Sequence, residues 1–152
     1  MKTIAKMKIR RMEHDDIPGV LEIEKVSFPH PWERREFDHL LSGPARGHSL
    51  RVISSADGGI LAYAIWQREP DAMRLLNLAV RPEYRRRALA ASLIERVARH
   101  GSPMLADVIE TNVPAQLFLK RLGWRCTEII RRPYDESDRD ALRFEAQYDC
   151  ET

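Results

Sequence analysis

The sequence has only two cysteines, Cys126 and Cys150, and no long apolar run. Two cysteines are too few for a disulfide framework. Neither they nor the five scattered histidines have metal-ligand spacing, so we expect no metal site. No apolar segment approaches the roughly 20 residues of a membrane-spanning helix, and the charged N-terminus lacks the apolar stretch of a secretory signal. We therefore expect a cytoplasmic protein with no membrane partner.

The sequence also lacks an excess of one charge. Its 25 basic and 23 acidic residues leave a net charge of +2, which gives no reason to expect a nucleic acid as a direct partner. In contrast, 43% of the 152 residues are hydrophobic, which is enough to form a core. We expect one domain that covers residues 1–152.

Short apolar segments alternate with Gly and Pro, and this pattern predicts an α/β (α+β) fold in the order β-αα-ββ-β-α-β-α-β-β. The expected strands are residues 7–11, 49–54, 60–68, 75–80, 103–110, 126–132 and 141–148. The expected helices run from Asp15 or Asp16 to about residue 26, over 33–41, from 88 onward and over 113–122. We expect a mixed, mostly antiparallel sheet flanked by about four helices, with one parallel pair where the third helix crosses over.

Residues 75–100 carry the most informative pattern: an apolar strand, an arginine-rich loop and an amphipathic helix. Apolar residues recur at spacings of four in two adjacent rows, Leu89, Leu93 and Val97, and Ala90, Ile94 and Ala98. The unpaired amides at the start of such a helix favour an anion, and Arg85, Arg86 and Arg87 add positive charge. A second interpretation is a solvated arginine cluster beside an ordinary connection.

The segment LAVRPEYRRRALAASLI resembles the acetyl-coenzyme A loop of the GNAT superfamily of N-acetyltransferases. That loop has Arg or Gln, two residues, Gly, one residue, then Gly or Ala; Arg85, Ala88 and Ala90 hold these places. The resemblance implies a GNAT fold and coenzyme binding by the strand before the loop and by the loop itself. The implied residues are Leu78, Ala79, Val80, Arg85, Arg86, Arg87, Ala88, Leu89, Ala90 and Ala91.

Ala88 departs from this family pattern, which usually has glycine there. If the position requires a positive φ, alanine costs about 1 to 2 kcal/mol. If φ is negative, alanine costs nothing and is the better helix former. The sequence leaves both possibilities open.

A second motif, ETNVPAQLFLKRLGW, resembles the late helix of the same family. Asn112 is either a helix N-cap or a coenzyme contact, and it can be both; Gly123 is a C-cap glycine. Leu119 stands where many relatives carry a tyrosine that protonates the departing thiolate, and leucine has no proton to give. Tyr134 is the candidate replacement, or a surface tyrosine in a turn.

The reaction also requires a base, because only a neutral amine attacks a thioester. By the resemblance, Asp107 stands where relatives place a glutamate base, and the shorter acid would act through a water. The alternative is a partly exposed strand carboxylate. Glu110 points to the other side of that strand and is a candidate substrate contact or a loop charge.

The segment Phe28-Pro29-His30-Pro31-Trp32 resembles the substrate-groove segment of bacterial ribosomal-protein alanine N-acetyltransferases and their kin. The ending IIRRPYDESDRDALRFEA also resembles theirs. Trp32 is therefore a candidate substrate contact, although it can equally be a core anchor over the first two helices.

These features together predict an enzyme that transfers acetyl from acetyl-coenzyme A directly to a primary amine. The preferred acceptor is a protein or peptide N-terminus, in particular a ribosomal protein. A small amine is the alternative acceptor. Two further alternatives are a non-catalytic acyl-coenzyme A binding module, favoured by Ala88 and Leu119, and an RNA-associated protein that uses Arg85 to Arg87.

Overall fold

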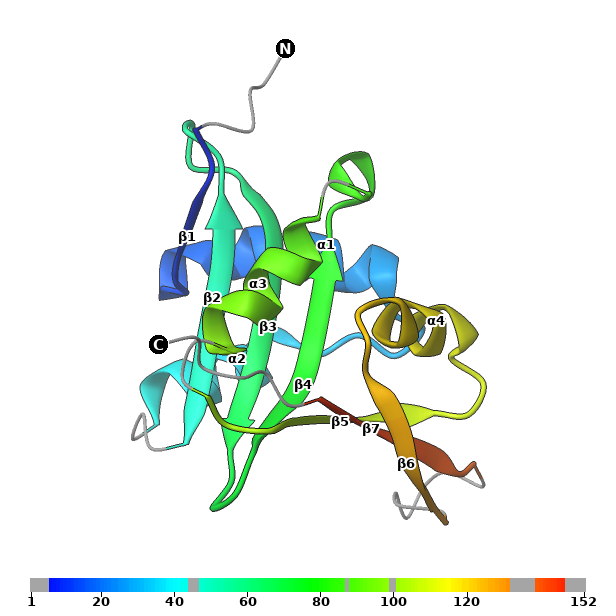
Figure 1. Ribbon diagram of the computed structural model, residues 1–152. Helices are drawn as coiled ribbons and strands as arrows, with labels where there is room; N and C mark the ends of the chain where they lie inside the picture. The colour runs from blue at the N-terminus through cyan, green and yellow to red at the C-terminus, as the bar shows by residue number, and fades with distance from the viewer. Residues whose placement is uncertain (1–5, 44–46, 87, 99–100, 132–138, 147–152) are drawn as a thin grey trace. The chain divides into compact units, whose positions relative to one another are not determined.

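The computed structural model describes residues 6–43, 47–86, 88–98, 101–131 and 139–146, and its elements follow the predicted order (Figure 1). The strands are β1 (Lys8–Arg11), β2 (His48–Ser54), β3 (Ile60–Arg68), β4 (Met73–Val80), β5 (Met104–Ile109), β6 (Arg125–Ile130) and β7 (Ala141–Ala146). The helices are α1 (Ile17–Ser27), α2 (Arg34–Ser42), α3 (Leu89–Ala98) and α4 (Val113–Arg121), and the short 3-10 helices are η2 (His14–Asp16) and η3 (Pro82–Tyr84). None of the helices within these ranges is long and apolar enough to cross a membrane.

The seven strands form one sheet in the order β1-β2-β3-β4-β5-β7-β6. β4 and β5 are parallel and pair through Met73 with Met104 and Arg74 with Leu105. The pairs β1–β2, β2–β3, β5–β7 and β6–β7 are antiparallel. This confirms the predicted mixed, mostly antiparallel sheet with a helical crossover, α3, between its parallel strands.

The chain divides into two compact units, which we describe separately. The first comprises residues 1–68 and 76–97, and the second comprises residues 69–75 and 98–152. The first unit therefore contains α1, α2, most of α3, β1 to β3 and the end of β4. The second contains the start of β4, all of β5 to β7, and α4.

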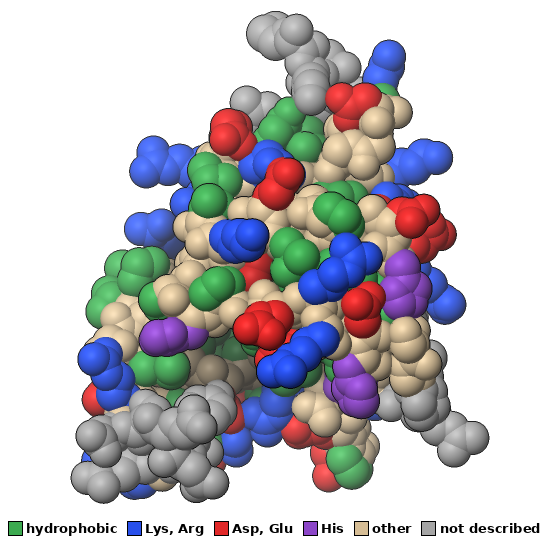
Figure 2. All heavy atoms as spheres, turned by 180° about the vertical axis from the view of Figure 1, so that it is seen from behind, with side chains coloured by type: hydrophobic (Ala, Val, Ile, Leu, Met, Phe, Trp, Pro, Cys, Tyr) green, Lys and Arg blue, Asp and Glu red, His purple; other side chains and the backbone are tan. Residues whose placement is uncertain are grey.

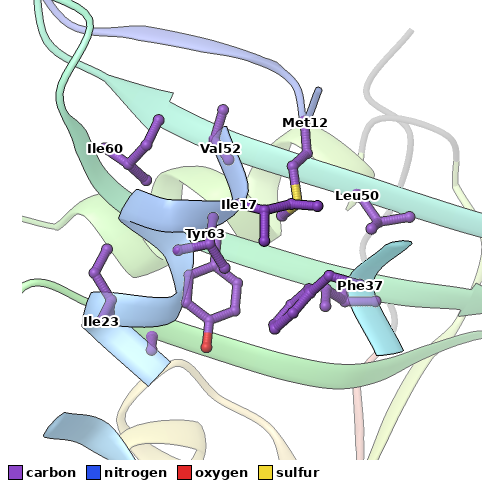
Figure 3. Close-up of a cluster of buried hydrophobic side chains, with 11 residues drawn as sticks. Met12, Ile17, Ile23, Phe37, Leu50, Val52, Ile60 and Tyr63 are labelled. Atoms are coloured by element: carbon purple, nitrogen blue, oxygen red, sulfur yellow. The ribbon is translucent and has the colours of Figure 1, made fainter. Parts of the chain in front are cut away.

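The first unit has apolar layers on both faces of its strands. On one face, side chains from α1 and α2 pack against β2 and β3 around the fully buried Phe37 and Tyr63 (Figure 3). On the other face lies α3, whose Leu89, Leu93 and Val97 are buried as the helical periodicity predicted (Figure 1). Each large apolar side chain that is fully buried contributes about 1.5 to 3 kcal/mol of transfer free energy.

The start of α1 differs in detail from the prediction that Asp15 or Asp16 caps the helix. Asp16 does occupy the N-cap position, but its side chain makes no cap hydrogen bond. Its two carboxylate oxygens instead accept hydrogen bonds from the Arg10 guanidinium at 2.7 and 2.8 Å. Asp16 Oδ2 also accepts the Glu13 backbone N–H at 2.8 Å, so both carboxylate oxygens have partners, and the bidentate pair with Arg10 joins two opposite charges.

The second unit fixes both ends of α4 as the sequence predicted. Asn112 Oδ1 accepts a hydrogen bond from the Ala115 backbone N–H at 3.3 Å, so Asn112 is an N-cap. At the other end Gly123 has φ +91, and the Trp124 N–H donates to the Leu119 carbonyl at 2.9 Å. This 6→1 bond across a left-handed glycine is a Schellman motif.

The surface reflects the near-balance of charge in the sequence. Basic and acidic side chains are interspersed on the face shown in Figure 2. Mixed charges produce only weak long-range attraction for a polyanion. Local groups of arginine therefore contribute more to the binding of an anion than the net charge does.

Candidate active site

The arginine-rich loop of the first unit is attached to β3 at its start. The Arg81 N–H donates to the Leu61 carbonyl at 2.8 Å, and Arg81 Nε donates to the Ile60 carbonyl at 2.9 Å. Arg85 Nε donates back to the carbonyl of Val80, the last residue of β4, at 3.1 Å. These bonds attach Arg81 to the start of β3 and Arg85 to the end of β4.

The start of α3 has backbone donors with no acceptor among the helix residues that the structure describes. The first intrahelical bond runs from the Ser92 N–H to the Ala88 carbonyl at 3.0 Å. The amides of Leu89, Ala90 and Ala91 consequently have no acceptor within the helix. The buried Leu89 side chain anchors this end, while Arg86 and Ala88 are exposed beside it. Free amides, the positive end of the helix dipole and nearby guanidinium groups fit a phosphate or pyrophosphate.

The structure answers the question that the sequence left open at Ala88. Ala88 has φ 60 and Arg86 has φ 65, both in the left-handed region. At Ala88, where the family usually has glycine, the side chain therefore costs about 1 to 2 kcal/mol. Arg87, also predicted to bind coenzyme, lies outside the described residues.

We expect Ala88→Gly to raise the free energy of unfolding by about 0.5 to 1 kcal/mol. Glycine relieves the left-handed strain, and the larger entropy of the unfolded chain offsets about half of this gain. Urea unfolding of the two proteins measures the difference. A less stable glycine variant would mean that residue 88 does not adopt a positive φ in solution.

The strand residues predicted to bind coenzyme lie at the end of β4. Ala79 is buried in the apolar cluster beneath α1, whereas Leu78 and Val80 are partly buried. The sequence predicted a buried strand here, and the side chains of β4 are either buried or partly buried. Pairing of this backbone with a pantetheine arm remains a prediction.

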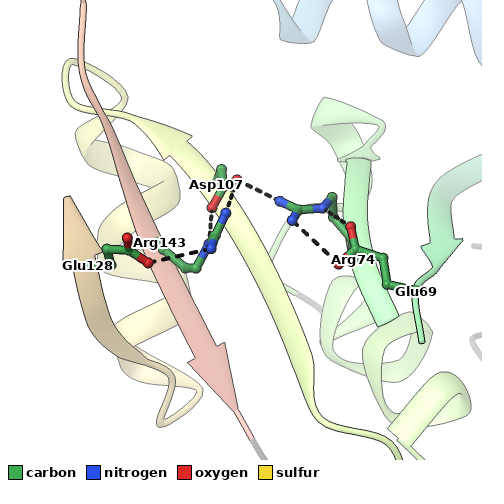
Figure 4. Close-up of polar contacts among 5 residues, drawn as sticks. All are labelled: Glu69, Arg74, Asp107, Glu128 and Arg143. Atoms are coloured by element: carbon green, nitrogen blue, oxygen red, sulfur yellow. Dashed lines mark hydrogen bonds and ion pairs between the residues drawn. The ribbon is translucent and has the colours of Figure 1, made fainter. Parts of the chain in front are cut away.

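Asp107, the predicted base, lies in an ion-pair cluster of the second unit (Figure 4). Arg74 Nη1 is 2.5 Å from Asp107 Oδ2, and Arg143 contacts both carboxylate oxygens at 2.8 and 3.0 Å. Glu69 pairs with Arg74 at 2.5 Å, and Glu128 lies 3.5 Å from Arg143. Acidic and basic side chains thus alternate along the cluster, in the order Glu69, Arg74, Asp107, Arg143 and Glu128.

The cluster changes the acidity of Asp107. Partial burial alone favours the neutral acid, but the hydrogen bonds and charges of Arg143 and Arg74 outweigh it. Together these effects hold the pKa of the Asp107 carboxyl below its ordinary value. Asp107 is therefore ionised at neutral pH, and it is a weaker proton acceptor than an unpaired carboxylate.

The sequence did not identify the two arginines. Arg143 is the direct cross-strand partner of Asp107 in the β5–β7 register, and such a register cannot be derived from one strand alone. Arg74 is the one charged residue of β4, and its position in this mainly apolar strand was the available signal.

The other residues that the sequence analysis singled out differ in how far they are buried. Glu110 is exposed, and its backbone N–H donates to the Asp140 carbonyl at 3.0 Å. Trp32 is partly buried, with its ring centroid 5.4 Å from that of Phe37, as expected for a core anchor. Leu119 is buried at 3% exposure. Tyr134 lies outside the described residues.

Comparison with known proteins extends the likeness over most of the chain. Residues 17–124 match the Acetyltransferase (GNAT) family. A Bacillus subtilis (strain 168) protein, provisionally named a ribosomal protein bS18-alanine N-acetyltransferase, is 32% identical over 148 residues, covering 93% of this chain and 95% of its own. The ribosomal protein bS18-alanine N-acetyltransferase of Escherichia coli (strain K12) is 29% identical, covering 86% of this chain and 88% of its own.

A solved structure gives the same result for the fold. The crystal structure of the ribosomal-protein-S18-alanine N-acetyltransferase from Escherichia coli has a TM-score of 0.75 and 26% identity, and the match covers 93% of each chain. The family match, the β4–loop–α3 geometry and this fold agree. The chain belongs to the GNAT family and is an N-acetyltransferase.

Proposed function

We propose that this enzyme transfers acetyl from acetyl-coenzyme A to the N-terminal alanine of a ribosomal protein of the bS18 type. The observation that carries the proposal is identity of 32% across 93% of this chain and 95% of a relative with that name. The similarity extends beyond residues 17–124, the segment of the family match. The likeness to this relative is therefore not limited to the segment that the whole family shares.

The donor would bind at the end of β4 and the start of α3. The family uses acetyl-coenzyme A, and the amides of Leu89, Ala90 and Ala91 would hold its pyrophosphate together with Arg86. The backbone of Leu78 to Val80 would pair with the pantetheine arm. Asn112, whose side-chain oxygen already caps α4, would add its amide N–H groups to the coenzyme contacts.

The chemistry would be direct transfer without an acetyl-enzyme. The neutral amine of the acceptor attacks the thioester carbonyl, the C–S bond breaks, and the coenzyme leaves as a thiolate that takes up a proton. Asp107 would accept the amine proton through a water, since its oxygens are held by Arg74 and Arg143. Tyr134 would supply the final proton, and Trp32 and Glu110 would contact the acceptor.

The test is an acetylation assay with the purified protein, acetyl-coenzyme A and a peptide that carries the N-terminal sequence of bS18. We expect thiol release that depends on the peptide, with the added acetyl group located on the N-terminal alanine by mass spectrometry. The matched control is the same peptide with a blocked N-terminus. Spermidine tests the small-amine alternative.

Each outcome of this assay supports one of the alternative functions and contradicts the others. Release with spermidine but not with the peptide would replace the protein acceptor by a small amine. Calorimetric binding of acetyl-coenzyme A without release on any acceptor would favour a non-catalytic module, the alternative suggested by Leu119 and Ala88. Acetylation of an internal lysine on the blocked peptide would contradict the N-terminal assignment.

A further inference from the structure

A buried polar cluster lies in the first unit, outside the residues assigned to the reaction. Glu24 on α1 and Tyr63 on β3 are fully buried, and Asn77 on β4 is 9% exposed. The Tyr63 hydroxyl donates to Glu24 Oε1 at 2.6 Å, and Asn77 Nδ2 donates to both carboxylate oxygens, at 3.3 Å to Oε2. One carboxylate thus connects a helix with two strands.

The sequence contained a signal for this cluster. Glu24 follows Ile17 and Val20 at helical spacings of seven and four, which places it on the apolar face of α1. A carboxylate on such a face requires polar partners, because burying an unpaired charge costs several kcal/mol. Asn77 is a polar residue in an apolar strand and supplies one of these partners.

Burial of the Glu24 carboxylate costs free energy even with these hydrogen bonds. Burial raises the pKa of the Glu24 carboxyl, although the hydrogen bonds from Tyr63 and Asn77 oppose the rise. Burial and the nearby Glu24 also raise the pKa of the Tyr63 hydroxyl. An apolar side chain of similar volume would fill this site without that cost, so the carboxylate serves more than packing.

The cluster lies next to the residues assigned to the coenzyme and to the residue assigned to the acceptor. Asn77 immediately precedes Leu78, the first strand residue assigned to the coenzyme. On the other side, Trp32 is partly buried against the apolar cluster that contains Phe37 and Tyr63. The ring centroid of Trp32 is 5.4 Å from that of Phe37, and Phe37 packs in a T-shaped arrangement against Tyr63 at 6.2 Å. Phe37 and Tyr63 are labelled in Figure 3.

We propose that Glu24 is a positioning residue whose buried carboxylate holds the end of β4 through Asn77 and, through Tyr63 and Phe37, supports the packing of Trp32. The proposal rests on the function proposed above, which assigns β4 to the coenzyme and Trp32 to the acceptor. Glu24 is fully buried, so it offers no surface to either substrate. Its effect is therefore on the affinities for both and not on the chemical step.

Two variants and one matched control test this role. Glu24→Gln keeps the shape but turns an acceptor oxygen into a donor, so we expect the acetyl-coenzyme A Kd and the peptide KM each to rise about 5- to 10-fold with kcat within about twofold. Asn77→Ala frees only β4 and is expected to raise the coenzyme Kd alone. Ile53→Val, a change at a buried β2 residue outside the apolar cluster that contains Tyr63 and Ala79, is expected to change neither constant.

Unchanged Kd and KM in Glu24→Gln, with a loss of Tm like that of Ile53→Val, would overturn the proposal. If Glu24→Gln does not fold, Asn77→Ala decides, because it removes one hydrogen-bonding partner of the carboxylate; an unchanged coenzyme Kd in this variant overturns the proposal. If the wild type does not acetylate the peptide, the proposed function fails, while the coenzyme Kd of these variants still tests Glu24.

Discussion

Asp107→Asn is expected to lower kcat for peptide acetylation by about 100-fold and the free energy of unfolding by about 2 kcal/mol. The catalytic loss follows because the amide cannot accept the amine proton, and general base catalysis contributes at least about two orders of magnitude. The stability loss follows because Arg74 and Arg143 would lose their shared counter-ion, while the side chain at 107 is only 14% exposed. Steady-state kinetics and urea unfolding measure the two effects.

Arg143→Gln separates catalysis from structure, because it breaks the same cluster but keeps the carboxylate. We expect it to lose stability as Asp107→Asn does and to retain most of kcat. Removing one guanidinium also raises the pKa of Asp107 towards its ordinary value, so the acid limb of the kcat/KM profile moves to higher pH. If Asp107→Asn keeps kcat within about threefold, Asp107 is a structural anchor and another group takes the proton.

The same cluster predicts how stability depends on pH. The pKa of Asp107 is lower in the folded than in the unfolded protein, so its contribution is fully present above the unfolded value of about 3.9. It is lost as the pH falls through the lower, folded value. The difference in unfolding free energy between wild type and Asp107→Asn should therefore be constant near neutral pH and shrink below about pH 4.

The fold was predictable because its signals are local. The apolar spacing of Leu89, Leu93 and Val97, Pro18 in the first turn of α1, and Gly123 after α4 each act over a few residues. The structure confirms the element order and moves most boundaries by one or two residues. Parts of the predicted final strands, at residues 132 and 147–148, lie outside the described residues.

The site was less predictable because its chemistry depends on contacts between distant segments. The basicity of Asp107 depends on Arg74 and Arg143, which are 33 and 36 residues away along the chain. The same holds for Glu24 and Asn77, separated by 53 residues. The family motif located the coenzyme loop, but whether Ala88 is strained was a question of φ that the motif could not answer.

Ala90→Asp is expected to weaken acetyl-coenzyme A binding at least about 10-fold without destabilising the protein. An acidic residue in the first turn of α3 is favourable with the helix dipole, by about 0.3 to 1 kcal/mol. The same carboxylate would repel a pyrophosphate on the amides of Leu89 to Ala91, at about 1 to 4 kcal/mol for two charges 4 Å apart near a protein surface. Calorimetric titration and thermal unfolding give the two values.

Ala90→Asp is expected to weaken coenzyme binding but not to lower stability, and these opposite effects distinguish lost binding from general unfolding. Ala90→Ser adds a polar group of similar size without charge, so its coenzyme Kd should stay within about threefold of the wild type. Raising the salt concentration should reduce the loss in Ala90→Asp, because exposed charges are screened. Unchanged binding in Ala90→Asp would place the pyrophosphate away from the start of α3, even if the enzyme remained active on its peptide. A weaker affinity that recovers with salt, together with an unchanged or higher Tm, is the combination expected for an anion bound at this helix end.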